Sequence, residues 1–81
     1  MPEHVLPLED VLRRLPAESA AQLRILIDWI DDVSCVRRVQ PPLGYQLVGT
    51  LGPHTVCTSR HAELSAALVD EFRTLLVEDA R

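Results

Sequence analysis

Lysine and asparagine are both absent from this sequence, and its eight basic residues are all arginine. Arginine alone favours fork-shaped, bidentate contacts with carboxylates or phosphates. However, the arginines do not form one cluster in the sequence. The codon bias of a GC-rich bacterial or phage genome explains their use more simply. With 12 acidic residues against 8 basic ones the net charge is −4, which disfavours general attraction to nucleic acid or to an anionic membrane surface.

Cysteines are few, since only Cys35 and Cys57 are present, and two are too few for a disulfide scaffold. The first residues lack the charged segment and apolar stretch of a signal peptide. No apolar run approaches the length that spans a bilayer. We therefore expect a cytoplasmic protein with reduced thiols and no membrane contact. A single bridge between Cys35 and Cys57 stays open as the alternative.

The remaining composition is that of one small globular domain over residues 1–81, because 47% of the residues are hydrophobic. A domain of this size buries only roughly 60–65% of its unfolded surface. Its stability is marginal unless a disulfide, a metal ion or a partner chain contributes.

Two amphipathic helices are predicted in the N-terminal part, over residues 8–15 and 16–33. Pro16 separates them, because it disfavours a helical conformation at Leu15 and suits the first position of a new helix. The first helix has apolar residues at the helical spacing, namely Leu8, Val11, Leu12 and Leu15. The core-facing stripe of the second helix comprises Leu23, Leu26, Ile27, Ile30 and Val33.

The middle of the chain changes period. Alternating apolar residues over 45–51, a turn at Gly52–His54 and a returning strand predict a hairpin over residues 45–58. Cys35–Gln40 either supplies a third strand or extends the preceding helix. A third helix is predicted over 60–78, with Thr58 or Ser59 as its N-cap. The predicted fold class is α+β, with two N-terminal helices and one C-terminal helix on a small antiparallel hairpin or three-stranded sheet.

Four residues of zinc-ligand type are present, namely Cys35, His54, Cys57 and His61. A zinc-stabilised binding module is therefore one alternative. Strong zinc motifs contain two closely spaced pairs, whereas Cys35 has no near neighbour. His61 also falls on the apolar face of the predicted third helix. We therefore expect no metal and no cofactor.

Nucleophilic chemistry would need Cys57 beside His54 or His61, or Ser59 beside His61. Cys57 in a short strand is more typical of a small buried hydrophobic residue, and Ser59 of a helix cap. No nucleophile elbow and no glycine-rich phosphate loop is present. We expect no catalytic residues and no enzyme.

The most informative feature is a second apolar patch on the predicted helix 16–33. Ile25 and Trp29 lie four residues apart and well away from the core-facing stripe. Either the fold covers them or another chain does, and two apolar faces are hard to bury in so short a chain. We therefore expect a non-enzymatic protein-binding or regulatory module that acts as a homodimer. The expected recognition surface comprises Ile25, Asp28, Trp29, Asp32, Arg37 and Arg38.

A winged-helix-like DNA-binding regulator is the other alternative. Residues 16–33 would enter the major groove, while Arg37, Arg38 and wing residues near His54 would contact phosphates. The polar edge of that helix holds one arginine among three aspartates, which phosphates would repel. The expected partner is therefore another protein or a second copy of the chain, not nucleic acid.

Overall fold

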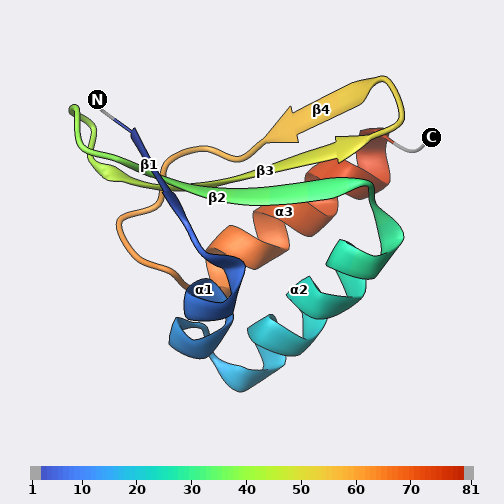
Figure 1. Ribbon diagram of the computed structural model, residues 1–81, viewed down its shortest axis with the longest axis horizontal. Helices are drawn as coiled ribbons and strands as arrows, with labels where there is room; N and C mark the ends of the chain where they lie inside the picture. The colour runs from blue at the N-terminus through green and yellow to red at the C-terminus, as the bar shows by residue number, and fades with distance from the viewer. Residues whose placement is uncertain (1–2, 80–81) are drawn as a thin grey trace.

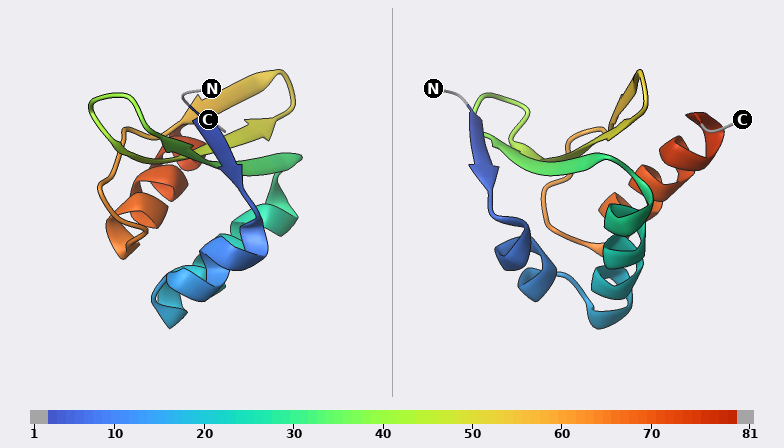
Figure 2. Two further views of the ribbon diagram at one scale, coloured as in Figure 1. Left: turned by 60° about the vertical axis from the view of Figure 1, so that its left-hand side comes forward. Right: turned by 45° about the vertical axis from the view of Figure 1, so that its right-hand side comes forward.

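The computed structural model describes residues 3–79. Four strands form one antiparallel sheet in the order β1-β2-β3-β4, and three helices lie on one face of it (Figures 1 and 2). The predicted α+β class is therefore confirmed, but the sheet has four strands where a hairpin or a three-stranded sheet was expected. In chain order the elements are β1 (Glu3–Leu6), α1 (Leu8–Arg14), α2 (Ala17–Trp29), β2 (Asp32–Arg38), β3 (Gly44–Leu51), β4 (His54–Cys57) and α3 (Ala66–Asp79).

The two N-terminal helices begin where proline sets the backbone. Pro7 precedes α1 and Pro16 precedes α2, and the Pro16 carbonyl accepts a hydrogen bond of 2.9 Å from the Ala20 amide. Helix α1 has acidic residues in its first turn and basic residues in its last, as the helix dipole favours. Leu15 is extended, which ends α1 one residue earlier than predicted.

The predicted C-terminal boundary of the second helix was wrong, because α2 ends at Trp29 and β2 already begins at Asp32. Ile30 is already extended, with φ −116° and ψ 167°. Val33 and Cys35 are both buried, two residues apart, and so face the core from a strand. Ile30 and Val33 satisfy helical spacing as well, which is why the helix was predicted to continue. The alternative that Cys35–Gln40 contributes to a third strand is confirmed, with the strand spanning Asp32–Arg38.

Strand β1 was not predicted. It pairs antiparallel with β2, placing Val5 opposite Val36 and Leu6 opposite Cys35. Four residues before a proline are too few to show an alternating pattern, so only the partner strand defines the element. The predicted hairpin is confirmed to within one residue at each end, with Gly52 at φ 60° in its turn.

Helix α3 begins six residues later than predicted, because the preceding segment is held against β3. The Tyr45 amide donates to the His61 carbonyl at 2.7 Å, and the His61 amide donates to the Tyr45 carbonyl at 2.9 Å. Thr58 is not an N-cap. Its hydroxyl is buried and accepts a hydrogen bond of 3.0 Å from the Leu47 amide. Ser59 likewise lies well before the helix.

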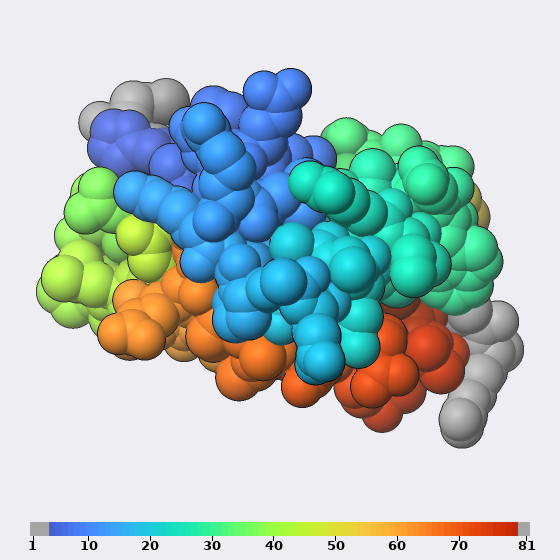
Figure 3. Space-filling view, turned by 90° about the horizontal axis from the view of Figure 1, so that it is seen from below, coloured from blue at the N-terminus to red at the C-terminus, as the bar shows by residue number. Residues whose placement is uncertain are grey.

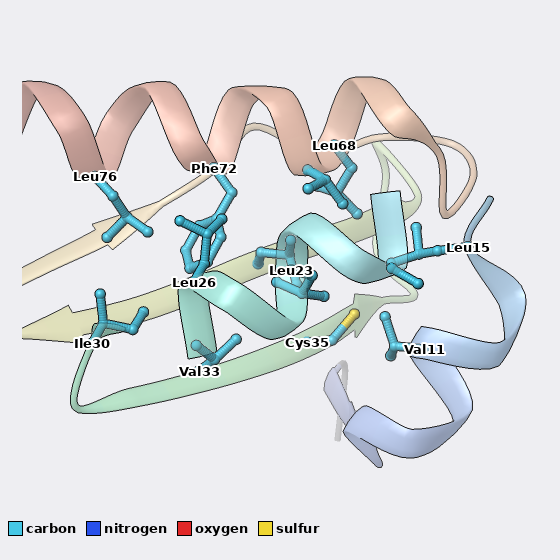
Figure 4. Packing of buried hydrophobic residues seen from close by; sticks show 13 residues of the cluster. Val11, Leu15, Leu23, Leu26, Ile30, Val33, Cys35, Leu68, Phe72 and Leu76 are labelled. Carbon is cyan, nitrogen blue, oxygen red and sulfur yellow. The ribbon is translucent and has the colours of Figure 1, made fainter. Parts of the chain in front are cut away.

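The core lies between the sheet and the helix layer. Figure 4 shows Leu68, Phe72 and Leu76 pointing inward from α3, toward side chains of α2 and β2. Phe72 is fully buried above Gly49 of β3, where a Cβ would lie 2.6 Å from its ring. Within the described part of the chain, no helix combines the length and the apolar character needed to cross a membrane.

Candidate functional site: the outer face of helix α2

Helix α2 buries one side and presents the other to solvent. Ser19, Leu23 and Leu26 are buried. Ile25 and Trp29 lie outside this buried stripe, and 69% and 50% of their surfaces are exposed. The fold therefore leaves both side chains largely uncovered.

The rim of this pair is acidic toward the C-terminal end of the helix. Asp28 is exposed beside the pair, whereas Asp32, opposite Thr50 at the start of β2, is exposed on the sheet face without helices. Among the described side chains neither forms an ion pair. Asp31 accepts a hydrogen bond of 2.8 Å from the Gly52 amide, which ties this end of the helix to the hairpin turn. Carboxylates near a helix C-terminus oppose the helix dipole. The stability of α2 therefore does not explain why Asp28 is there.

The expected recognition surface is divided between the two ends of β2. Asp32 is the first residue of this strand and Arg38 the last, about 20 Å apart at the usual rise per residue. Arg37 and Arg38 therefore do not join the surface around Trp29. Arg38 Nε donates a 2.6 Å hydrogen bond to Gln46 Oε1, on the sheet face without helices. Arg37 is exposed and points to the opposite face.

A hollow lies beside Arg37, and we call it the basic notch. Its first part has a volume of about 330 Å³ and is lined by Arg37, Arg38, Val39, Leu43, Gly44, Tyr45 and Ala62. An adjoining part of about 340 Å³ shares Tyr45 and Ala62 and adds Arg14, Glu63 and Leu64.

Sequence reasoning missed Arg14 and Tyr45 as members of the basic notch. Tyr45 faces Arg37 only through the pairing of β2 with β3, and Arg14 comes from the last turn of α1. No local pattern relates these three residues, so no signal in the sequence could have assembled the notch.

The two cysteines lie on opposite faces of the sheet. Cys35 pairs with Leu47 and faces the helices, whereas Cys57 pairs with the next residue, Val48, and is exposed on the other face. The alternative of a Cys35–Cys57 bridge is therefore excluded in this fold. Burial raises the pKa of the Cys35 thiol to about 11, with a small opposing effect of the Arg14 charge.

The four residues of zinc-ligand type are dispersed. His54 Nδ1 lies 3.7 Å from Asp79 Oδ2, His61 contacts Glu71, and the cysteines occupy separate faces. Within residues 3–79, no group of three or more His, Cys, Asp or Glu side chains is arranged to hold a metal ion.

Ser59 and His61, considered above as a nucleophile and its base, meet Glu71 of α3. Glu71 Oε1 lies 2.7 Å from both Ser59 Oγ and His61 Nε2, and Ser59 Oγ lies 3.5 Å from that same nitrogen. A catalytic relay needs the carboxylate on one imidazole nitrogen and the hydroxyl on the other. Here the carboxylate binds the hydroxyl directly. The cluster instead fastens the segment before α3 to the helix.

The hydrogen bonds to Glu71 predict that the stability of the protein depends on pH. The Ser59 amide donates a 2.6 Å hydrogen bond to Glu71 Oε2. This bond is the main reason why the pKa of the carboxyl lies below its usual value of 4.5. Desolvation raises that pKa, whereas His61 and the Ser59 hydroxyl lower it further. Because the carboxyl has a lower pKa in the folded protein than in the unfolded chain, the ionised Glu71 stabilises the folded state at any pH above the unfolded pKa. This stabilisation is lost as the pH falls through the pKa of Glu71 in the folded protein.

We therefore expect Glu71→Gln to lower Tm at neutral pH, and the difference from wild type to shrink below about pH 4. Thermal melts by circular dichroism over a pH series measure this. Glu78→Gln, an exposed position on the same helix, is the control and should change Tm little. A difference for Glu71→Gln that is as large in acid as at neutral pH would contradict the prediction.

No protein family matches this chain, and no curated protein or solved structure is similar to it.

Proposed function

We propose that this protein is a non-enzymatic protein-binding module that acts as a homodimer through the outer face of α2. The observation that carries the proposal is the pair Ile25 and Trp29, which share one helix face and are 69% and 50% exposed. Single exposed apolar residues are common on protein surfaces, but a tryptophan paired with an isoleucine forms a continuous apolar surface. Tryptophan is enriched at the centres of interfaces and among the few residues that contribute most of the binding energy.

The size of the chain supports a second copy as the partner. The core is small, and covering Ile25 and Trp29 adds roughly 1.5–3 kcal/mol for each fully buried side chain. In a two-fold dimer every contact is made twice, so one patch per chain provides two sets of contacts. Self-association therefore stabilises a small domain without requiring any new surface feature.

The winged-helix alternative has less support. The outer face of α2 carries Ile25 and Trp29, with Asp28 exposed beside them. Phosphates would be repelled from it. Arg37 and Arg38, the proposed phosphate contacts, lie at the far end of β2.

Trp29→Glu tests the proposal. A charge placed in the dimer contact would have to lose water without gaining a partner. We expect the dimer to dissociate, with a Kd raised at least about tenfold, as a loss of 1.4 kcal/mol or more implies. Light scattering coupled to size-exclusion chromatography over a concentration series measures the mass, and far-UV circular dichroism verifies the fold.

Val77→Glu is the matched control, because Val77 is 44% exposed on α3 and lies outside the proposed contact. It should leave the mass unchanged. Ile25→Glu gives a second disruption of the same face, should Trp29→Glu fail to fold. A wild-type protein that is monomeric at every concentration, or a folded Trp29→Glu variant that remains dimeric, would refute the proposal.

A further inference from the structure

Opposite charges gather at the two ends of β2, and each end also carries exposed apolar surface. Asp28 and Trp29 end α2 beside the start of β2, and the basic notch lies at the other end of that strand. Figure 1 shows the course of β2 from α2 to the β2–β3 loop. We propose that the basic notch receives Trp29 of a second copy, so that the dimer contains two identical contacts related by a two-fold axis. This inference rests on the proposed function and adds what Trp29 contacts.

The basic residues of the notch and the acidic residues near Trp29 are complementary in charge. Arg14 and Arg37 are exposed, and no described carboxylate lies within 4.0 Å of either. Asp32 and Arg37 are about 17 Å apart along β2, farther than the screening length of about 8 Å at physiological ionic strength. The charges therefore do not neutralise each other within one chain. Two copies packed with antiparallel long axes place each acidic end against a basic end.

The chemistry of the notch suits a tryptophan flanked by carboxylates. Leu43, which is 65% exposed, and Tyr45 provide apolar and aromatic surface, and Arg37 lies at the same hollow. A guanidinium over an indole face is a favourable cation–π contact, and tyrosine adds an aromatic contact. The volume of about 330 Å³ falls within the range of pockets that hold compact ligands.

The walls of the notch are held in place without a ligand. Arg60 Nη1 donates hydrogen bonds to the carbonyls of Gln40 at 3.0 Å and Pro42 at 2.7 Å, which anchors the β2–β3 loop. A Cβ on Gly44 would lie 2.6 Å from the His61 carbonyl oxygen, so glycine alone permits this close approach. A preformed site loses little conformational entropy when it binds.

Two reciprocal contacts require that α2 and the segments around the notch are accessible from one side of the molecule. Seen from the helix side, α2 and the segments 39–43 and 60–64 around the notch are all visible at the surface (Figure 3). Two copies that meet face to face can therefore make both contacts at once.

Paired charge reversals test the inference. Asp28→Arg faces Arg37 in its own homodimer, and Arg37→Asp faces Asp28, so each variant alone should be monomeric, with a Kd at least about tenfold above wild type. In a mixture, one contact has both charges reversed and the other is wild-type. We therefore expect an equimolar mixture of the two variants to form a heterodimer of near wild-type affinity, measured by sedimentation velocity.

The controls separate this inference from the proposed function. Arg73→Asp, at an exposed position of α3, should remain dimeric, and circular dichroism should show all variants folded. Asp28→Lys, the same charge reversal with a different side chain, replaces Asp28→Arg if the latter does not fold. If Trp29→Glu is monomeric but Arg37→Asp remains dimeric, the α2 face is an interface and the notch is not its receptor. A mixture that stays monomeric also overturns the inference.

Discussion

Replacing Phe72 with alanine should destabilise the protein by about 3–5 kcal/mol, a large share of the 5–15 kcal/mol that small domains typically possess. Phe72 is the sole phenylalanine, is 0% exposed and belongs to the core between α2, α3 and the sheet. Alanine would lose the transfer free energy of the ring and leave a cavity that the surrounding helices fill only in part.

Urea denaturation followed by far-UV circular dichroism measures this loss. All variants are compared at one protein concentration, because dimerisation adds to apparent stability by mass action. Val77→Ala, at a 44% exposed position of the same helix, is the control and should cost less than about 1 kcal/mol. A similarly small loss of stability for Phe72→Ala would contradict the central place of Phe72 in the core.

The elements predicted well from sequence carry local boundary signals. Pro16 separates α1 from α2, and Gly52 with Pro53 forms the turn of the β3–β4 hairpin. In each case the residue restricts or permits a particular backbone conformation whatever the rest of the chain does. These signals explain the accuracy at the first helix and at the hairpin.

The elements predicted poorly depend on distant residues. No glycine or proline separates Trp29 from Asp32, and Ile30 and Val33 fit either a helix or a strand, so only the sheet decides where α2 ends. His61 has suitable helical spacing but pairs with Tyr45, which delays α3. Tertiary contacts override local periodicity at both places.

The candidate site also has one part that follows from local sequence and one part that depends on distant residues. Ile25 and Trp29 lie four residues apart on one helix, so their common face follows from helical spacing alone. The basic notch joins Arg14, Arg37 and Tyr45 from three elements, and it depends on strand register. Arg37 was expected beside Trp29, but β2 carries it to the far end of the strand.

Gly49 should be the least replaceable residue of β3. Its missing side chain makes room for Phe72, since a Cβ there would lie 2.6 Å from Phe72 Cζ, 2.8 Å from Cε1 and 3.0 Å from Ile30 Cδ1. Valine has a higher strand propensity than glycine, so local preference alone predicts that Gly49→Val stabilises the sheet. Packing predicts the opposite, a loss of about 3 kcal/mol, because the fully buried Phe72 ring would have to shift.

A double-mutant cycle measured by urea denaturation separates these two effects. In a Phe72→Ala background the valine enters the volume that the ring has left, so Gly49→Val should cost much less there than in the wild-type protein. Thr50→Val, at the next position on the sheet face without helices, is the control and should change stability by no more than about 0.5 kcal/mol. If the stability losses from Gly49→Val and Phe72→Ala simply add, the contact between the Phe72 ring and β3 does not determine which side chain position 49 tolerates.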